Sequence, residues 1–277
     1  MEEIQMKGGK IIVTGASGAM GSAATRELAA RGHSVVMACR NPGKAETVRD
    51  GILAEMPDAD IVIKRLDLGS LDSVRSFAED LGDEPVSALF NNAGVISRGY
   101  SLTADGLENT FAVNYFGPVL LTESILPQML PDAKVVNMVS LTCRYVSIDE
   151  RSLRPAPEDF SQLGTYARSK LALLRFSQEL ARLNPTLRVN LADPGIVNSN
   201  MISLGHWFDP LADVLFRPFC KSPERGVEPA LRALASEESG RYFVGKGSKA
   251  IPLCFSDPAL DLRLWDETER ILSGALA

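Results

Sequence analysis

Apolar residues gather in short runs that recur along the first two thirds of the chain. The runs lie at 10–15, 33–39, 60–67, 86–92, 134–140 and 187–195. Each is rich in Val, Ile or Leu and lacks the clean alternation of a half-exposed strand. This pattern is typical of strands that are buried on both faces of a parallel sheet.

Segments with helical periodicity separate these runs and cover 19–32, 70–82, 107–130 and 164–183. Gly32 and Gly82 are suited to end the first two helices, and Ser70 is suited to cap the start of the second. Strands that alternate with helices predict an α/β protein with a Rossmann fold. We expect a doubly wound parallel sheet with helices on both faces.

The chain has no internal repeat, low-complexity tract or Pro/Gly-rich linker, so we expect a single domain over residues 1–277. The residue composition changes after Pro194, where apolar and aromatic residues are interrupted by Gly and Pro. Such a stretch predicts a lid or substrate loop at about 197–222. Packing of a short helix, or a subunit contact, is the alternative interpretation.

Composition narrows the possible functions. The formal net charge of -6 argues against a nucleic-acid surface. The four cysteines lie far apart and the chain has only two histidines, so we expect no metal site and interpret the cysteines as buried thiols in a reducing compartment. No apolar run approaches the length of about 18 residues that a membrane span needs. We therefore expect a cytoplasmic protein without a membrane partner.

A glycine-rich segment, "TGASGAMG" (residues 14–21), follows the first apolar run directly. Gly15, Gly18 and Gly21 would lie between the first strand and the first helix, where unpaired N–H groups suit a pyrophosphate. A plain strand-to-helix turn would use glycines in the same way. The position after the first buried strand favours the phosphate cradle.

The end of the second predicted strand bears on the choice of cofactor. A carboxylate at this place holds the ribose 2′-hydroxyl in NAD sites, but this chain has Cys39 followed by Arg40. A guanidinium suits a 2′-phosphate and gains nothing from a bare hydroxyl, which favours this interpretation over a surface arginine after a strand. We predict NADP(H) rather than NAD(H).

Tyr166 and Lys170 stand four residues apart in "YARSK" and face the same side of a predicted helix. An ammonium beside a tyrosine stabilises the phenolate and lowers its pKa from the ordinary value of about 10. The pair could therefore act as an acid/base. The spacing alone occurs by chance in many helices, so further motifs must support it.

Those motifs are present, and in their order the chain resembles the short-chain dehydrogenase/reductase family from about residue 10 to 270. The matching elements are "TGASGAMG", "NNAG" (91–94), a helix carrying Asn114, Ser140, "YARSK" and "PGIVNS". Stretches such as "ACRNP" and "GRYFVGKGSKAIP" look most like the retinol-dehydrogenase-like branch. The resemblance implies a homodimer or homotetramer formed through the long helices that hold Asn114 and Tyr166.

The resemblance also implies residue roles. Tyr166 would protonate the carbonyl oxygen, Lys170 would lower its pKa and bind the nicotinamide ribose, and Ser140 would polarise the carbonyl. Asn114 would anchor a water in a proton relay. The cofactor would be held by Gly15, Ser17, Gly18, Met20, Gly21, Arg40, Asn41, Asp67, Leu68, Asn92, Ala93, Gly94, Tyr166, Lys170, Pro194, Gly195, Val197 and Ser199.

The chain departs from the family pattern at a few positions. Ala19 stands where the common glycine loop has its second glycine, and Gly18 takes the spacing of the extended branch. An alanine there costs little if it already begins the helix. Asp193 precedes the Pro-Gly pair, where a neutral residue or a histidine is more familiar. Near the nicotinamide, its charge would favour the oxidised, cationic ring.

The predicted function is hydride transfer between NADP(H) and a small apolar alcohol, aldehyde or ketone. A nucleotide-sugar epimerase or dehydratase is suggested by the glycine spacing, but the residues after Pro194 leave little room for a sugar-nucleotide domain. A non-catalytic NADP-binding redox sensor is the alternative from another class. It would not need the complete set of Asn114, Ser140, Tyr166 and Lys170.

Overall fold

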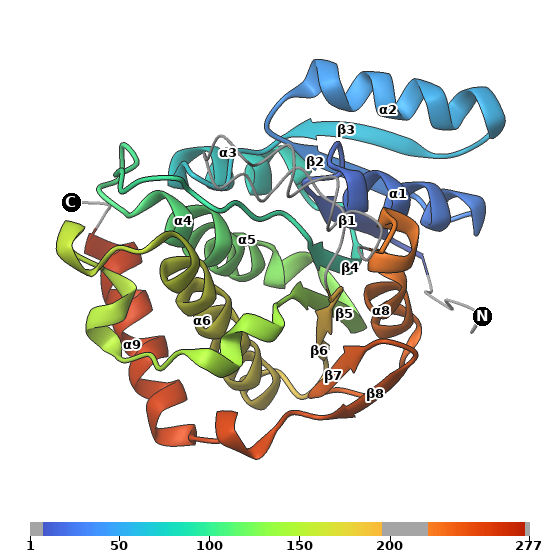
Figure 1. Ribbon diagram of the computed structural model, residues 1–277. Coiled ribbons are helices and arrows are strands. Elements are labelled where there is room, and N and C mark those ends of the chain that lie inside the picture. The colour runs from blue at the N-terminus through green and yellow to red at the C-terminus, as the bar shows by residue number, and fades with distance from the viewer. Residues whose placement is uncertain (1–7, 196–220, 275–277) are drawn as a thin grey trace.

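A computed structural model describes residues 8–195 and 221–274 and contains one mixed sheet at its centre (Figure 1). The strands are β1 (Lys10–Thr14), β2 (Val35–Cys39), β3 (Ile61–Arg65), β4 (Val86–Asn91), β5 (Met129–Met138), β6 (Arg188–Asp193), β7 (Arg241–Val244) and β8 (Gly247–Ala250). Their order is β3-β2-β1-β4-β5-β6-β7-β8, and only β8 runs antiparallel to its neighbour. The first six strands have the order of the dinucleotide-binding fold. The predicted parallel sheet is confirmed.

Helices connect the strands as right-handed crossovers require. The α-helices are α1 (Ala19–Ala30), α2 (Pro42–Glu55), α3 (Leu71–Leu81), α4 (Asn109–Phe111), α5 (Gly117–Ile125), α6 (Gln162–Leu183), α8 (Pro223–Ala235) and α9 (Pro258–Gly274). A π-helical segment, Ala112–Phe116, joins α4 to α5. Short 3₁₀ turns lie at Leu126–Gln128, Leu141–Tyr145, Glu150–Leu153, Pro157–Asp159 and Leu253–Phe255.

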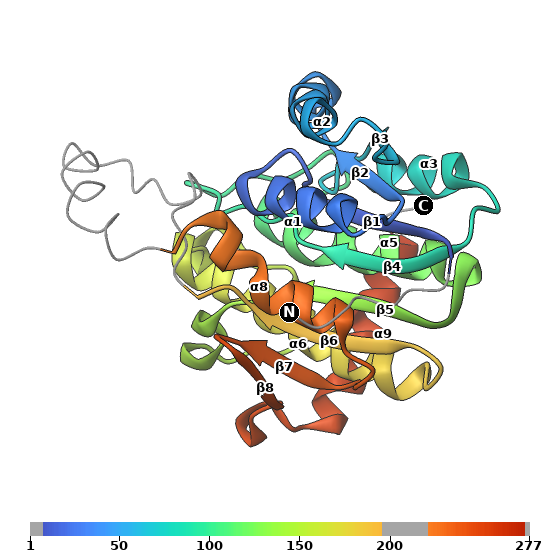
Figure 2. The same ribbon diagram turned by 90° about the vertical axis from the view of Figure 1, so that its right-hand side faces the viewer.

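The helices form a layer on each side of the sheet (Figures 1 and 2). Side chains of α1, α2 and α8 pack with one face of the strands in one apolar cluster. Side chains of α3, α5 and α6 pack with the opposite face in two further clusters. The central strands are buried on both sides, which explains why their sequences show no alternation.

Local sequence signals place the ends of several helices. The Ser70 hydroxyl accepts a hydrogen bond from the backbone N–H of Ser73 at 3.3 Å, and α3 ends at Gly82, whose φ is 60°. Asn41 caps α2 in the same way, accepting from the Lys44 N–H at 3.1 Å. The caps predicted at Ser70 and Gly82 are confirmed.

Helix α9 packs against the outer side of α6, away from the sheet (Figure 1). Phe176 of α6 stacks on Trp265 of α9 with ring centroids 5.2 Å apart. Arg175 donates to the Asp261 carboxylate at 2.8 Å, and both side chains are buried. The chain therefore covers with its own helix part of the surface on which we expected a partner subunit.

The structure corrects some sequence-based boundaries. The helix expected over 107–130 ends at Ile125, and residues from Met129 onward already belong to β5, although Pro131 and Asp132 interrupt the apolar pattern. Asn114 lies on the π-helical segment rather than on an α-helix. The expectation of buried cysteines is wrong for Cys254, which is exposed in the loop after β8, while Cys39 and Cys143 are buried. Cys220 lies outside the described residues.

Within the described ranges, no helix combines the length and the apolar character that crossing a bilayer requires.

Candidate active site

The glycine loop between β1 and α1 forms a tight turn that side chains would disrupt. Gly15 has a φ of 64°, and its carbonyl accepts the Gly18 N–H at 2.9 Å. A Cβ on Gly21 would lie only 2.3 Å from the Gly15 carbonyl oxygen, closer than atoms can approach. Gly15 and Gly21 are therefore required by the backbone itself, whereas a Cβ on Gly18 would meet the same oxygen at 3.2 Å.

Ala19 is the first residue of α1, with Gly18 as its N-cap. Because Ala19 already belongs to the helix, an alanine in place of the family's glycine costs little stability here. The first N–H groups of α1 have no side-chain cap, so they remain free to bind an anion.

A cavity of about 450 Å³ lies at the carboxyl ends of β1, β2 and β4. The order of the strands reverses between β1 and β4, which is where ligands bind in open α/β sheets. The lining residues are Gly15, Ser17, Gly18, Ala19, Met20, Gly21, Ala38, Arg40, Asn41, Lys44, Leu66, Asp67, Leu68, Asn92, Ala93, Gly94, Val95 and Val113. The cofactor residues expected in the first half of the chain are thus brought together.

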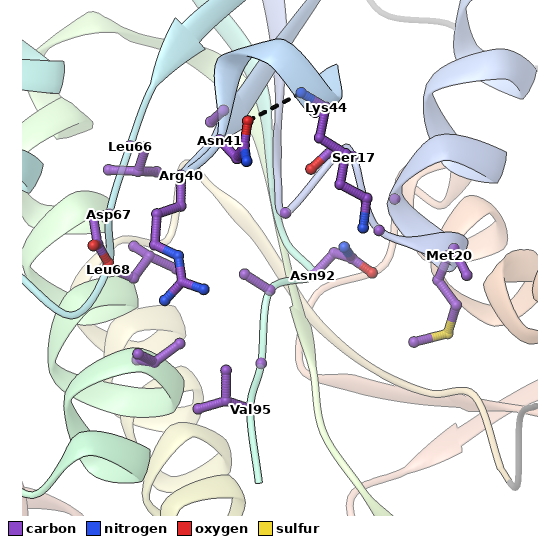
Figure 3. A pocket seen from close by; sticks show the side chains of 18 residues that line it. Ser17, Met20, Arg40, Asn41, Lys44, Leu66, Asp67, Leu68, Asn92 and Val95 are labelled. Atoms are coloured by element: carbon purple, nitrogen blue, oxygen red, sulfur yellow. Dashed lines mark hydrogen bonds between the residues drawn. The ribbon is translucent and has the colours of Figure 1, made fainter. Parts of the chain in front are cut away.

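Two basic side chains extend into this cavity, one from the turn after β2 and one from the start of α2 (Figure 3). The Arg40 side chain extends into the cavity on the side of Asp67 and Leu68, and Lys44 runs past Ser17. Arg40 is exposed and forms no hydrogen bond or ion pair with the described residues, so its charge is available to a ligand. Lys44 was missed by the sequence analysis, because α2 itself was not predicted.

Asn92 connects the end of β4 to the end of β1 by hydrogen bonds and lines the cavity. Its side-chain N–H donates to the Thr14 carbonyl at 2.8 Å, and the Thr14 hydroxyl accepts the backbone N–H groups of Asn92 and Ala93, each at 3.0 Å. The Asn92 Oδ1 atom is buried and has no hydrogen-bond partner in the described part of the chain. A buried acceptor without a donor costs free energy, so this oxygen is suited to a ligand's donor group. The glycine cradle, the free cation and this oxygen fit a dinucleotide.

Asn114 connects the loop after β4 to α6. Its amide binds both backbone groups of Val95, accepting from the N–H at 2.8 Å and donating to the carbonyl at 2.9 Å. It also donates to the Ser169 hydroxyl at 3.0 Å, and that hydroxyl donates to the Tyr166 carbonyl at 2.7 Å. Ser169 is thus an additional positioning residue, recognisable in sequence only by its place before Lys170.

Lys170 is buried where the cavity ends. Its ammonium donates to the Met138 carbonyl at 2.9 Å, and a Cβ on Gly94 would lie 3.3 Å from the Nζ atom. Gly94 lines the cavity, so this end of the cavity directly adjoins Lys170. Burial lowers the pKa of Lys170 to about 8, because a low-dielectric surrounding disfavours the ammonium.

Tyr166 and Ser140 complete this end of the site. Burial raises the pKa of Tyr166 to about 12, and a hydrogen bond with Ser140 partly offsets the increase. The Ser140 hydroxyl also accepts from the Thr142 hydroxyl at 3.0 Å. The expectation that Lys170 lowers the pKa of Tyr166 is wrong for this arrangement: burial raises that pKa, and the Lys170 ammonium donates to the Met138 carbonyl instead.

The last predicted cofactor segment begins after β6. Gly195 has a φ of 72°, and the Lys221 ammonium donates to the Pro194 carbonyl at 3.0 Å. Val197 and Ser199, together with most of the loop expected at 197–222, lie outside the described residues. Pro194 and Gly195 follow the strand next to the one that ends near Ser140.

Comparison of the sequence with known proteins identifies related dehydrogenases. A family model described as short chain dehydrogenase matches residues 9–205. The chain is 34% identical to retinol dehydrogenase 13 from Mus musculus, over 98% of this chain and 85% of that protein. It is 35% identical to retinol dehydrogenase 12 from Mus musculus, over 87% of this chain and 78% of that protein.

Solved structures show the same fold. An uncharacterized protein from Mycobacterium paratuberculosis superposes with a TM-score of 0.80 at 25% identity, covering 99% of this chain and 97% of that one. A short-chain dehydrogenase from Shigella flexneri, complexed with NADP, gives a TM-score of 0.68 at 20% identity, covering 89% of this chain and 100% of that one. The chain therefore belongs to the short-chain dehydrogenase/reductase family of oxidoreductases, in its retinol-dehydrogenase-like branch.

Proposed function

We propose that this protein is an NADP(H)-dependent oxidoreductase that interconverts an apolar alcohol and its aldehyde or ketone. One observation carries the proposal: a nucleotide-sized cavity adjoins buried Lys170 at its end and has on its wall Arg40, whose side chain has no partner among the described residues. Arg40 and Lys44 together would bind a 2′-phosphate, and a guanidinium gains little from the bare hydroxyl of NAD(H).

The residues at the end of the cavity have complementary tasks in carbonyl reduction. The cofactor supplies the hydride, and the protein must supply a proton. Ser140 donates a hydrogen bond to the carbonyl oxygen, and Tyr166 transfers its phenolic proton to the same oxygen. A pKa of about 12 keeps Tyr166 protonated at neutral pH, which is the form that reduction requires.

Lys170 and Asn114 support this proton transfer. The Lys170 pKa of about 8 allows the ammonium to exchange a proton near neutral pH, so that it can help to restore the Tyr166 proton. Asn114 holds the Val95 backbone and, through Ser169, the helix turn that carries Tyr166. It thereby fixes the distance between the nucleotide loop and the catalytic helix.

Apolar side chains beside the catalytic groups support an apolar substrate. Leu141 follows Ser140 directly and is 45% exposed, and Leu163 stands one helical turn before Tyr166 and is 53% exposed. Large exposed apolar residues next to a site favour an apolar ligand. Retinal and retinol belong in the first substrate panel, because the curated relatives carry the name retinol dehydrogenase.

The first test is a fluorescence titration with NADPH and NADH. We expect NADPH to bind more tightly to the wild type, and the preference to collapse in Arg40→Ala. Arg49→Ala is the matched control, since Arg49 lies on α2 in an ion pair with Asp50 at 2.9 Å and does not line the cavity. Equal or tighter binding of NADH by the wild type would refute the choice of NADP(H).

A second test separates the enzyme from a redox sensor. If NADPH binds but no member of a broad panel of apolar aldehydes and ketones is reduced, the sensor is favoured. Reduction that is lost in Tyr166→Phe, with NADPH binding retained, supports the proposed acid/base.

A further inference from the structure

Asp193 ends β6 beside the catalytic strand end, and the mechanism above does not use it. β5 and β6 are parallel neighbours with Met138 opposite Ala192, and the Val139 N–H donates to the Ala192 carbonyl at 2.9 Å. This register places Asp193 next to the backbone that leads into Ser140. Its side chain is almost completely buried, with 2% exposed.

Two neutral donors hold the Asp193 carboxylate. The Tyr242 hydroxyl of β7 donates to Oδ2 at 2.6 Å, and the Gly195 N–H donates to Oδ1 at 2.8 Å. Both carboxylate oxygens of Asp193 therefore accept a hydrogen bond from a group that carries no charge. Among the described residues Asp193 forms no ion pair, unlike buried Asp261, which is paired with Arg175.

Two basic residues on neighbouring elements donate to backbone carbonyls rather than to Asp193. The Lys170 ammonium donates to the Met138 carbonyl, and the Lys221 ammonium donates to the Pro194 carbonyl. The negative charge of Asp193 is therefore only partly balanced in a region of low dielectric, where charges interact strongly. The charge reaches the catalytic groups, since Asp193 contributes to raising the pKa of Tyr166 and of Cys143.

We propose that the buried Asp193 carboxylate distinguishes the two redox states of the nicotinamide cofactor and favours the oxidised one. This inference rests on the proposed function, which places the reacting ring beside Tyr166 and Ser140. The oxidised ring carries a positive charge and the reduced ring is neutral, while the rest of the two cofactor forms is the same. A partly balanced anion at this end of the site stabilises the cationic form and not the neutral one.

The test compares the dissociation constants of NADP⁺ and NADPH in wild type and in Asp193→Asn. The asparagine keeps the local hydrogen bonds, because its Oδ1 can accept the Gly195 N–H and its amide can donate to the Tyr242 oxygen. We expect the ratio of Kd(NADP⁺) to Kd(NADPH) to rise on the order of tenfold, the size expected of one unit charge acting through a protein interior. Calorimetry measures both constants without turnover.

Two control variants separate charge from structure. Tyr242→Phe removes a hydrogen bond but keeps the carboxylate, so the ratio should not rise. Asp67→Asn removes a carboxylate at the opposite end of the cavity, where both cofactor forms are the same, so both constants should change by the same factor. A melting curve for each variant verifies folding.

The outcomes are distinguishable. If Asp193→Asn weakens both cofactor forms equally, or leaves both unchanged, Asp193 only holds the Gly195 turn and the inference is overturned. If the wild type binds neither form, the proposed function fails before Asp193 is tested.

Discussion

A pair of carboxyl groups between α5 and α9 predicts an unusual pH dependence of stability. Glu123 of α5 is hydrogen-bonded to Glu269 of α9, and burial together with this neighbour raises the pKa of Glu123 from 4.5 to about 8. Glu123 Oε1 is buried, and no described residue forms a hydrogen bond with it. The folded protein therefore holds a proton here that the unfolded chain releases near pH 4.5.

The sign and the size of the effect follow from linkage. Between pH 4.5 and 8 the folded state binds more protons than the unfolded state, so stability falls as the pH rises. Each unit of the pKa difference corresponds to about 1.4 kcal/mol, which gives an upper bound of about 5 kcal/mol over this interval. Because Glu123 is partly accessible to solvent, which weakens the effect, we expect roughly 2–5 kcal/mol to be lost between pH 5 and pH 8.

Glu123→Gln removes the titrating group while it keeps the size and a hydrogen-bond donor. Urea denaturation at pH 5, 6.5 and 8 should show a flatter profile for this variant and a gain in stability over wild type that grows toward pH 8. Glu79→Gln is the control, because Glu79 is exposed on α3 and its side chain makes no hydrogen bond or ion pair with the described residues. Parallel pH profiles for wild type and Glu123→Gln would refute the reasoning.

Three further predictions concern the loop, the acid and the α6–α9 contact. Gly21→Ala should abolish NADPH binding in a fluorescence titration, because its Cβ would collide with the Gly15 carbonyl, whereas Gly51→Ala, with open space around its Cβ in α2, should raise stability by up to about 1 kcal/mol. Tyr166→Phe should lower kcat for reduction by roughly 10²–10⁴ and leave the Kd of NADPH nearly unchanged, and a kcat within a few fold of wild type would exclude Tyr166 as the acid. Arg175→Ala leaves a buried carboxylate unpaired and should cost about 3 kcal/mol or more in urea denaturation; a loss below 1 kcal/mol would contradict the importance of this ion pair.

The sequence predicted those parts of the fold in which burial leaves a pattern. The core strands were recognised because their residues are apolar on both faces, and α3 because its cap and its final glycine are local signals. Helix α2 was missed because only Ala45 and Ile52 of its side chains are buried, so no apolar stripe marks it. Strands β7 and β8 were also not predicted, because each contains only four residues and β8 is an exposed edge strand.

The candidate site was predictable where a motif is continuous in the sequence. The glycine loop and the Tyr166–Lys170 pair are such motifs, and the structure places each at the carboxyl edge of the sheet. The partners of these groups come from distant segments: Tyr242 meets Asp193 across 49 positions, and Asn114 meets Ser169 across 55. Such contacts depend on the register of strands and the packing of helices, which no local pattern encodes.

The packing of α9 on α6 has a consequence for the order of events during synthesis. Helix α6 carries Tyr166 and Lys170, yet the outer side of this helix is covered by a segment that follows every strand of the sheet in the sequence. A nascent chain that has completed the nucleotide cavity still exposes Phe176 and the unpaired Arg175 to solvent or to a chaperone. Only when Trp265 and Asp261 have left the ribosome can the helix that carries the catalytic pair gain its final support.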